Sequence, residues 1–377
     1  MTEHILSRLQ ERKNSGNSRK LTNGDILIDF VSNDYLGLSR SEELFQIISS
    51  YDYSEIVNKN GSSGSRLLAG NSMACSELEK KLAGIFKAEA ALIFNSGYSA
   101  NLAVVSSIPQ KGDTILYDSL SHVCLKEGAW LSKAESISFQ HNSMDDLELK
   151  LNRAKGDIFV IIESVYSMDG DKAPINEIIK LAKKYEAHII IDEAHSTGVM
   201  GKNGSGMICE LNLEDAFLAR VYTFGKGMGV HGACVCGSLE TIEYLINFGR
   251  PFIYTTALPI HSIFSIDASF EYLANHIDLQ KKLHKNIEYF NQLYDEHFVV
   301  KNGMLKPFSD TCIQPVIFPG NEKIKKLAQR FQVAGLDVRP ILSPTVKSGT
   351  ERLRISIHAH NTAEEIERLI GELINSI

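Results

Sequence analysis

Short apolar runs alternate with amphipathic stretches through the middle of the chain, and this alternation limits the fold more than any other feature. The expected strands cover residues 90–94, 114–117, 158–162, 188–191, 221–224 and 233–236. Two of the intervening stretches, residues 76–86 and 175–185, repeat their apolar residues at helical spacing. Strands that are apolar on both faces need cover on both faces. The pattern therefore predicts an α/β fold with a mostly parallel central sheet and helices on both sides.

The length of the chain and a change of character after residue 260 predict more than one domain. A chain of 377 residues is longer than a single hydrophobic core usually supports. A long helical region, from residue 262 to about 298, leads into expected strands at 313–317, 337–339 and 353–357 and a last helix at 363–374. We therefore expect an N-terminal segment (1–40), a large α/β domain (41–260) and a smaller α+β C-terminal domain (261–377).

Composition argues against several classes of partner. With 39 basic and 46 acidic residues the net charge is −7, so a nucleic-acid or anionic-membrane partner is not expected. No apolar run approaches the roughly 20 residues that span a bilayer. The first twenty residues are charged and lack the apolar core of a signal peptide. Six cysteines without a C-x-x-C pair fit a reduced, cytoplasmic protein.

The most informative segment is residues 189–195, an apolar strand that runs into Asp192 with His195 three positions later. Ligands of open α/β sheets bind beyond the carboxyl ends of the strands, which is where Asp192 is expected. A carboxylate there suits pyridoxal phosphate (PLP), whose pyridine nitrogen needs an acidic partner. A solvated acid at a strand end is the plainer interpretation. A metal site of His188, Asp192 and His195 is another, although no further ligand cluster follows.

A lysine lies between glycines directly after the next strand, in residues 223–229 (TFGKGMG). Flanking glycines let a bulky group approach the backbone, and a desolvated lysine amine can form a Schiff base. An exposed lysine in a turn is the alternative. Gly227, Gly229 and Gly232 also match G-x-G-x-x-G, but a strand is expected afterwards where a dinucleotide fold requires a helix.

Residues 95–101 (NSGYSAN) stand between an expected strand and an expected helix. Backbone N–H groups at a helix N-terminus bind phosphate, which makes Gly97 and Tyr98 candidates, although a simple helix cap is an alternative. His122 follows another strand and can stack on an aromatic ring or be purely structural. Phosphate loop, histidine, strand–Asp and strand–Lys occur in the order that a PLP site of this architecture uses.

Four motifs resemble those of the α-oxoamine synthases, a branch of the fold-type I PLP-dependent transferases. They are residues 32–38 (SNDYLGL), 164–171 (SVYSMDGD), 192–198 (DEAHSTG) and 223–226 (TFGK). Within the family, residues 225–230, 252–259 and 343–346 are most similar to the biotin-pathway branch. The resemblance extends along nearly the whole chain and implies PLP as the cofactor.

The resemblance also implies a role for individual residues. Lys226 forms the Schiff base and removes the α-proton of the amino acid. The other cofactor contacts are Asp192 at the pyridine nitrogen, His195 and Ser167 near the ring hydroxyl, His122 stacked on the ring, Gly97, Tyr98 and Thr223 at the phosphate, and Thr256 at the phosphate from the neighbouring subunit. Substrate contacts are expected from Arg354, which binds the amino acid carboxylate, and from Arg19, Asn33 and Thr345.

The implied reaction is a decarboxylative condensation of an amino acid with an acyl thioester in a homodimer with shared active sites. In the biotin-pathway branch the substrates are L-alanine and a pimeloyl thioester of coenzyme A or acyl carrier protein. One departure weakens that choice. Some members of the branch have an arginine at the position of Leu342, so an anionic acyl chain lacks one expected partner here unless Arg339 or Arg19 takes its place. Branches that use serine or glycine, and a PLP-binding module without turnover, stay open.

Overall fold

The computed structural model describes residues 2–19, 21, 27–54, 56, 58–297 and 306–375. It separates into two compact units. The larger unit comprises Asn33–Ser167 and Asp171–Leu283, and the smaller comprises Met1–Ser32, Met168–Gly170 and His284–Ile377. The observed units differ from the division expected at residues 40 and 260. Residues 261–283 belong to the larger unit because α11 (Ile260–Asn275) packs on α2 (Glu42–Ser49) and α3 (Met73–Ile85).

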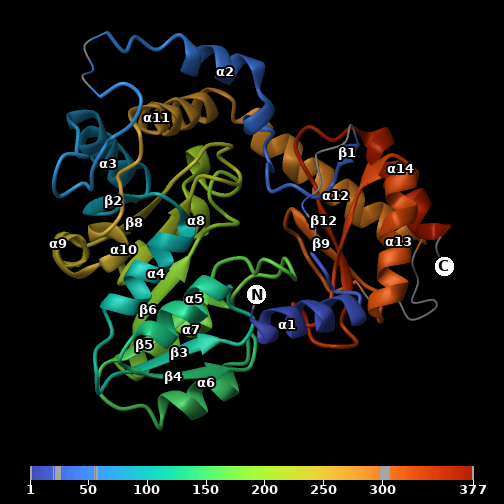
Figure 1. Cartoon of the computed structure of the whole chain (residues 1–377), viewed down its shortest axis with the longest axis horizontal. Helices are drawn as coiled ribbons and strands as arrows, with labels where there is room; N and C mark the ends of the chain where they lie inside the picture. Colours follow the sequence, from blue (N-terminus) through green and yellow to red (C-terminus); the bar gives the residue numbers. More distant parts are fainter. Residues whose placement is uncertain are drawn as a thin grey trace. The chain divides into compact units, whose positions relative to one another are not determined.

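A seven-stranded sheet forms the centre of the larger unit (Figure 1). Its strands are β2 (Ala90–Phe94), β3 (Thr114–Asp118), β4 (Glu135–Phe139), β5 (Ile158–Glu163), β6 (His188–Asp192), β7 (Ala219–Thr223) and β8 (Ala233–Gly237). Their order is β2-β8-β7-β6-β5-β3-β4, and β8 alone runs antiparallel to its neighbours. The expected mostly parallel sheet and its six expected strands are confirmed. The edge strand β4 was not expected, because its largely exposed residues do not form an apolar run.

Helices bury the apolar side chains of this sheet. The remaining helices of the larger unit are α4 (Gly97–Ser107), α5 (Val123–Leu131), α6 (Met144–Leu151), α7 (Ile175–Lys184), α8 (Gly206–Leu211), α9 (Leu239–Phe248) and α10 (Arg250–Ile253), with short 3-10 turns at Leu38–Arg40, Lys202–Gly204 and Glu214–Ala216. Side chains of α4, α5, α9 and α10 share one core cluster with alternate residues of β2, β3 and β5–β8. Helices α6 and α7 pack elsewhere on β3, β4 and β6. The strand ends that carry the polar residues are thereby held on a rigid scaffold.

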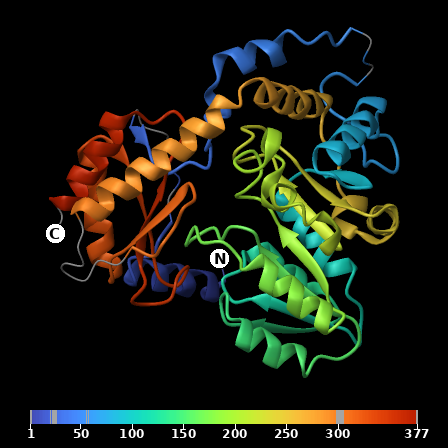
Figure 2. The ribbon, with the colours of Figure 1, turned by 180° about the vertical axis from the view of Figure 1, so that it is seen from behind.

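The smaller unit contains an antiparallel sheet, in the order β11-β12-β9, with helices beside it (Figure 2). Its elements are α1 (Glu3–Asn14), β1 (Ile28–Asp29), β9 (Ile313–Ile317), α13 (Asn321–Val333), β10 (Leu336–Asp337), β11 (Arg339–Ile341), β12 (Arg352–Ser356) and α14 (Ala363–Ile374). β1 pairs with β10 in parallel. The expected strand at 313–317 and helix at 363–374 are confirmed to the residue, and the strand expected at 337–339 is divided between β10 and β11.

The long helical region is two helices, α11 and α12 (Asp278–His297), because His276 leaves the helical conformation (φ −126°, ψ 51°). The expected end of this region at residue 298 lies outside the described residues. Among the helices that the structure describes, none combines the length and apolarity needed to cross a membrane. All six cysteines are buried as free thiols.

Candidate functional site

The carboxyl ends of β5, β6 and β7 and the N-terminus of α4 surround a cavity of about 260 Å³ in the larger unit. Its lining residues are Ser96, Gly97, Tyr98, Asn101, His122, Cys124, Glu163, Asp192, Ala194, His195, Thr223, Gly225, Lys226, His231 and Gly232. The structure thus brings together Gly97, Tyr98, His122, Asp192, His195, Thr223 and Lys226 from the residues predicted for the cofactor. Parallel strands deliver them here because their carboxyl ends meet at one edge of the sheet.

Asp192 is the last residue of β6 and is only 5% exposed. Its Oδ2 accepts a hydrogen bond of 2.7 Å from Asn101 Nδ2, and its Oδ1 accepts one of 2.8 Å from the backbone N–H of Ala194. Donors on both oxygens suit a carboxylate anion and fix its orientation. Asn101 was not predicted. It lies on α4 one turn after Gly97, so a polar residue on the cavity face of that helix was the available signal.

Lys226 lies after β7 and belongs to a chain of hydrogen bonds through His195. Its Nζ is 3.0 Å from His195 Nε2, and His195 Nδ1 is 2.7 Å from the hydroxyl of Tyr35. The Tyr35 hydroxyl donates its one proton to Asn33 Oδ1 at 3.0 Å. The hydroxyl must therefore accept from His195 Nδ1–H, which leaves the Nε2 lone pair directed at the Lys226 amine. Asn33, predicted as a substrate contact, takes part in this chain through Tyr35.

The N-terminus of α4 and the end of β7 form the phosphate-sized part of the cavity. A capping box between Ser96 and Ser99 satisfies the backbone N–H groups of these two residues. Gly97 and Tyr98 N–H have no partner within the helix, as is general for a first turn. Thr223 Oγ1 is buried and, among the described residues, has no hydrogen-bond partner. These donors and the positive end of the helix dipole suit a phosphate group.

His122 caps α5 and borders the cavity. The backbone N–H of Cys124 donates to His122 Nδ1 at 3.3 Å, and Cys124 Sγ lies 2.9 Å from the same nitrogen. Burial lowers the pKa of His122, although the Asp192 charge opposes the effect. The imidazole is therefore neutral at pH 7, with Nδ1 as an acceptor and the proton on Nε2.

Glu163, the last residue of β5, is a cavity residue that the sequence analysis missed. It is 2% exposed, and its Oε1 accepts a hydrogen bond from the backbone N–H of His122. Burial and, after it, the nearby Asp192 charge raise the pKa of Glu163 to about 8. An acid that ends an apolar strand was the signal used for Asp192, and the same signal was present at Glu163.

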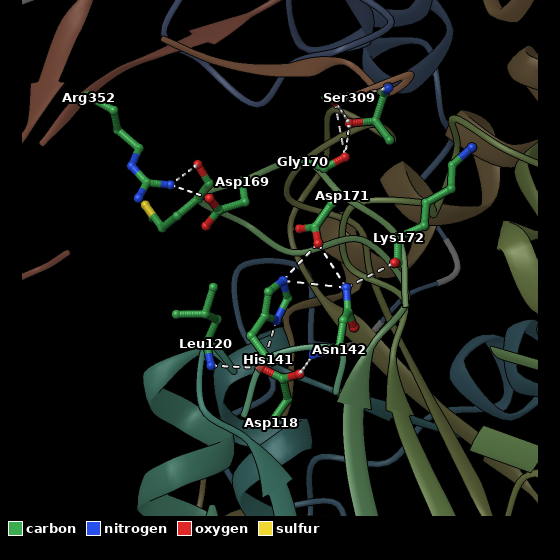
Figure 3. A network of polar contacts seen from close by, with 12 residues as sticks. Asp118, Leu120, His141, Asn142, Asp169, Gly170, Asp171, Lys172, Ser309 and Arg352 are labelled. Atoms are coloured by element: carbon green, nitrogen blue, oxygen red, sulfur yellow. Dashed lines mark hydrogen bonds and ion pairs between the residues drawn. The ribbon is translucent and has the colours of Figure 1, made fainter. Parts of the chain in front are cut away.

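A half-buried histidine, His141, connects two loops of the larger unit (Figure 3). His141 Nδ1 lies 2.9 Å from Asp118 Oδ1, and His141 Nε2 lies 2.7 Å from Asp171 Oδ2. Burial alone lowers the pKa of His141, but the two carboxylates outweigh it and raise the pKa to about 10. Asp118 also accepts from the N–H of Leu120 at 2.8 Å. A charged imidazole thus fixes the loop before His122 to the segment after residue 170.

The remaining predicted residues do not line the cavity. Ser167 is buried in the larger unit. Thr256 is exposed in the same unit, and its carbonyl accepts from Asn95 Nδ2 at 2.8 Å. Arg19, Thr345 and Arg354 belong to the smaller unit, where Arg354 is buried in β12 and donates to Ser356 Oγ at 3.0 Å.

Three other contacts in the smaller unit involve residues of the SVYSMDGD motif or Arg339, the possible replacement for the arginine missing at Leu342. Arg352 forms an ion pair with Asp169, and Ser309 Oγ donates to Gly170 O at 3.1 Å, so residues 169 and 170 of the SVYSMDGD motif are anchored (Figure 3). Arg339 Nε is 2.6 Å from Asp337 Oδ1. Arg339, one of the two arginines that could take the place of the arginine missing at position 342, is therefore already paired with Asp337.

The metal site considered for His188, Asp192 and His195 is not formed. His188 is the exposed first residue of β6, whereas Asp192 is its buried last residue and borders the cavity with His195. The two residues are four steps apart along the strand, which is roughly 13 Å at 3.3 Å per residue. Within the described part of the chain, these residues do not group as metal ligands.

Comparisons with known proteins agree with the geometry. The family model for aminotransferase class I and II matches residues 25–373. A protein from Emericella nidulans named 8-amino-7-oxononanoate synthase is 39% identical, with 98% of this chain and 94% of the relative covered. One of the same name from Lysinibacillus sphaericus is 36% identical, with 98% and 94% covered.

Solved structures show the same fold. Serine palmitoyltransferase from S. paucimobilis, solved with bound PLP and myriocin, matches with a TM-score of 0.88 at 26% identity, covering 99% of this chain and 96% of that one. The 8-amino-7-oxononanoate synthase of Francisella tularensis matches with a TM-score of 0.78 at 28% identity, covering 93% and 98%. The resemblance to the α-oxoamine synthases and the fold-type I architecture are thus confirmed, and PLP is the cofactor. The chain belongs to the aminotransferase class I and II family.

Proposed function

We propose that this protein is a PLP-dependent acyltransferase that condenses L-alanine with a pimeloyl thioester, with loss of CO₂, to give 8-amino-7-oxononanoate for biotin synthesis. The observation that carries the proposal is the meeting of Lys226, His195 and Asp192 in one cavity of a chain whose relatives bear that enzyme's name. The chemistry supplied by bound PLP is that of an electron sink for negative charge at the α-carbon of the amino acid.

The residues of the cavity fit the cofactor and divide its binding among them. Asp192, oriented by Asn101, would pair with the pyridine nitrogen, and its negative charge would favour the protonated form of that nitrogen. Thr223 Oγ1 and the N–H groups of Gly97 and Tyr98 would hold the phosphate. The Thr223 hydroxyl is buried without a partner of its own in the described chain, which is expected of a donor reserved for a ligand.

Lys226 would hold the cofactor, and its Nζ would take the α-proton of the amino acid. His195 Nε2 accepts a hydrogen bond from Nζ at 3.0 Å and so directs the amine. The tautomer of His195 depends on Tyr35, whose hydroxyl accepts from Nδ1. His122, which borders the cavity as a neutral imidazole, would cover the ring. Lysine is suited to this work because its amine is a base and a nucleophile once it is desolvated.

Substrate binding is assigned to Arg354, Arg19, Thr345 and Asn33, of which Asn33 belongs to the larger unit. Arg354 binds the amino acid carboxylate, for which a guanidinium fork is well shaped. Arg19, Asn33 and Thr345 contact the acyl substrate. Of the two arginines that could replace the one missing at Leu342, Arg19 is exposed, whereas Arg339 is paired with Asp337. Arg19 is therefore our choice for the distal carboxylate of the pimeloyl chain.

We further propose a cytoplasmic homodimer in which Thr256 of each subunit completes the phosphate site of the other. The Thr256 side chain is exposed in the single chain while its carbonyl is held by Asn95, so the hydroxyl is presented outward. Light scattering should give twice the mass of 41.9 kDa. A monomer with full activity would contradict the shared site.

A substrate panel tests the proposed reaction. L-Alanine with pimeloyl-CoA, L-serine with palmitoyl-CoA and glycine with acetyl-CoA are supplied in turn, and thiol release and product mass are measured, with pimeloyl-acyl carrier protein as a further donor. We expect the alanine–pimeloyl pair to give the highest kcat/KM. Serine palmitoyltransferase is the second candidate, favoured by its TM-score of 0.88, and a preference for serine and palmitoyl-CoA would select it. A preference for glycine would indicate a glycine C-acetyltransferase, and PLP binding without any turnover a non-catalytic module.

A further inference from the structure

Glu163 and Asp192 occupy equivalent places at the ends of neighbouring strands. They are paired in the register of β5 and β6, and both line the cavity. Their exposed fractions are 2% and 5%. Two largely buried acidic side chains therefore face one small cavity. Ionising both at once is unfavourable, because each charge lacks water and repels the other.

The hydrogen bonds of the two acids differ in kind. Asp192 accepts from two donors, the Asn101 amide and the Ala194 backbone N–H, one on each oxygen. Glu163 accepts from the backbone N–H of His122 at Oε1. A neutral acid can still accept at its carbonyl oxygen, so this bond does not require a charge on Glu163. The surroundings thus favour Asp192 as the anion and Glu163 as the neutral partner.

The charges around Glu163 come from several elements. Asp192 on β6 and Asp118 on β3 raise the pKa of the acid, whereas Lys226 after β7 lowers it. The His122 N–H also lowers it, and burial is the largest influence and raises it. The net result is a pKa of about 8, so the acid holds its proton at pH 7 and loses it in mildly alkaline solution.

We propose that Glu163 is a positioning residue that works in its protonated form, holding the main chain of His122 while leaving Asp192 as the single carboxylate anion facing the cofactor. This inference rests on the proposed function, because it assigns Asp192 to the pyridine nitrogen. Ionisation of Glu163 places a second negative charge beside Asp192, in the same cavity as the phosphate site. PLP, which carries a negatively charged phosphate, is then bound less tightly.

Two variants separate a neutral from a charged Glu163. Glu163→Gln keeps an oxygen for the His122 N–H and copies the neutral acid, whereas Glu163→Ala removes the acceptor. Glu177→Gln, on the exposed side of α7, is the matched control for an added amide. We expect the dissociation constant for PLP of the wild type to rise about tenfold between about pH 7 and pH 9, as one neighbouring charge can cause. Glu163→Gln should stay flat over that range, and Glu163→Ala should bind weakly at every pH.

The protonation state is measured separately on the protein without cofactor. A ¹³C-carboxyl titration by NMR, with Glu163→Gln identifying the signal, should show one glutamate titrating near pH 8. Glutamate that titrates near its ordinary 4.5 would overturn the inference, and so would a Glu163→Gln variant that loses PLP affinity in parallel with the wild type above pH 8. PLP could fail to bind to the wild type and to every variant while the NMR titration still finds a Glu163 pKa near 8. That result would refute the proposed function but not the protonation of Glu163.

Discussion

Gly97 stands where the helix that receives the phosphate meets the end of β7, and the structure leaves no room for a side chain there. A Cβ added at Gly97 would overlap Thr223 Cγ2 and lie 3.2 Å from Thr223 Cβ. Carbon atoms pack at about 3.5–4.0 Å, so either the threonine or the start of α4 has to move. Both elements carry proposed phosphate donors, and Gly97→Ala should therefore weaken PLP binding.

The expected size follows from the cost of overpacking. Forcing an extra carbon into a packed site costs about 1–3 kcal/mol. If the cost falls on the bound geometry, the dissociation constant for PLP should rise about 5- to 150-fold. Gly84→Ala is the matched control, because a Cβ at Gly84 has no atom within 4 Å and the residue lies in helix α3. That variant should bind PLP normally and be more stable by about 0.5–1 kcal/mol.

A second substitution identifies the cause of the loss. Thr223→Ser removes the methyl group that the new Cβ overlaps and keeps the hydroxyl, so the double variant Gly97→Ala/Thr223→Ser should recover most of the affinity. Fluorescence titration of the cofactor-free protein measures all three constants. Unchanged affinity in Gly97→Ala, or a double variant no better than the single one, would refute the assignment of this contact to the phosphate site.

Two further substitutions test the residues around the cavity. Tyr35→Phe leaves His195 Nδ1 and Asn33 without the hydroxyl, so we expect a loss of about 1–3 kcal/mol in unfolding free energy and a lower kcat with little change in KM; equal kcat values would remove Tyr35 from the account. His141→Gln removes the ion pairs whose strength raises the histidine pKa from 6.5 to about 10. The stability that they supply is fully present below pH 6.5 and is lost as the pH rises towards 10. Urea unfolding should accordingly show the largest difference from wild type near pH 6, and a difference that does not shrink towards pH 10 would contradict the pairing.

The sequence predicted the fold well because its signals are local. Buried parallel strands appear as continuous apolar runs, and six of the seven strands of the large sheet were found in this way. The edge strand β4 escaped because its residues are mostly exposed. The boundary after residue 260 differs from the observed unit because α11 packs back on α2 and α3, which no local pattern indicates.

The candidate site was predicted in its main residues and missed in its supporting ones. Asp192 and Lys226 follow strands directly, so their position could be inferred from their neighbours. Tyr35 meets His195 across 160 positions, and Asn101 meets Asp192 across 91. Such contacts depend on the tertiary fold and leave no trace in spacing or hydrophobic pattern. Glu163 was a different case, because it carried the same strand-end signal as Asp192.

The central claim is that Lys226 holds PLP in this cavity and that L-alanine replaces it there. An absorption spectrum of the purified protein with added PLP, followed by titration with L-alanine, L-serine and glycine, tests this claim most directly. We predict a visible band typical of a protonated Schiff base, a shift that is strongest with L-alanine, and no such band in Lys226→Ala beyond that of free PLP. An unmodified spectrum of free PLP in the wild type, or an identical bound spectrum in Lys226→Ala, would contradict the account.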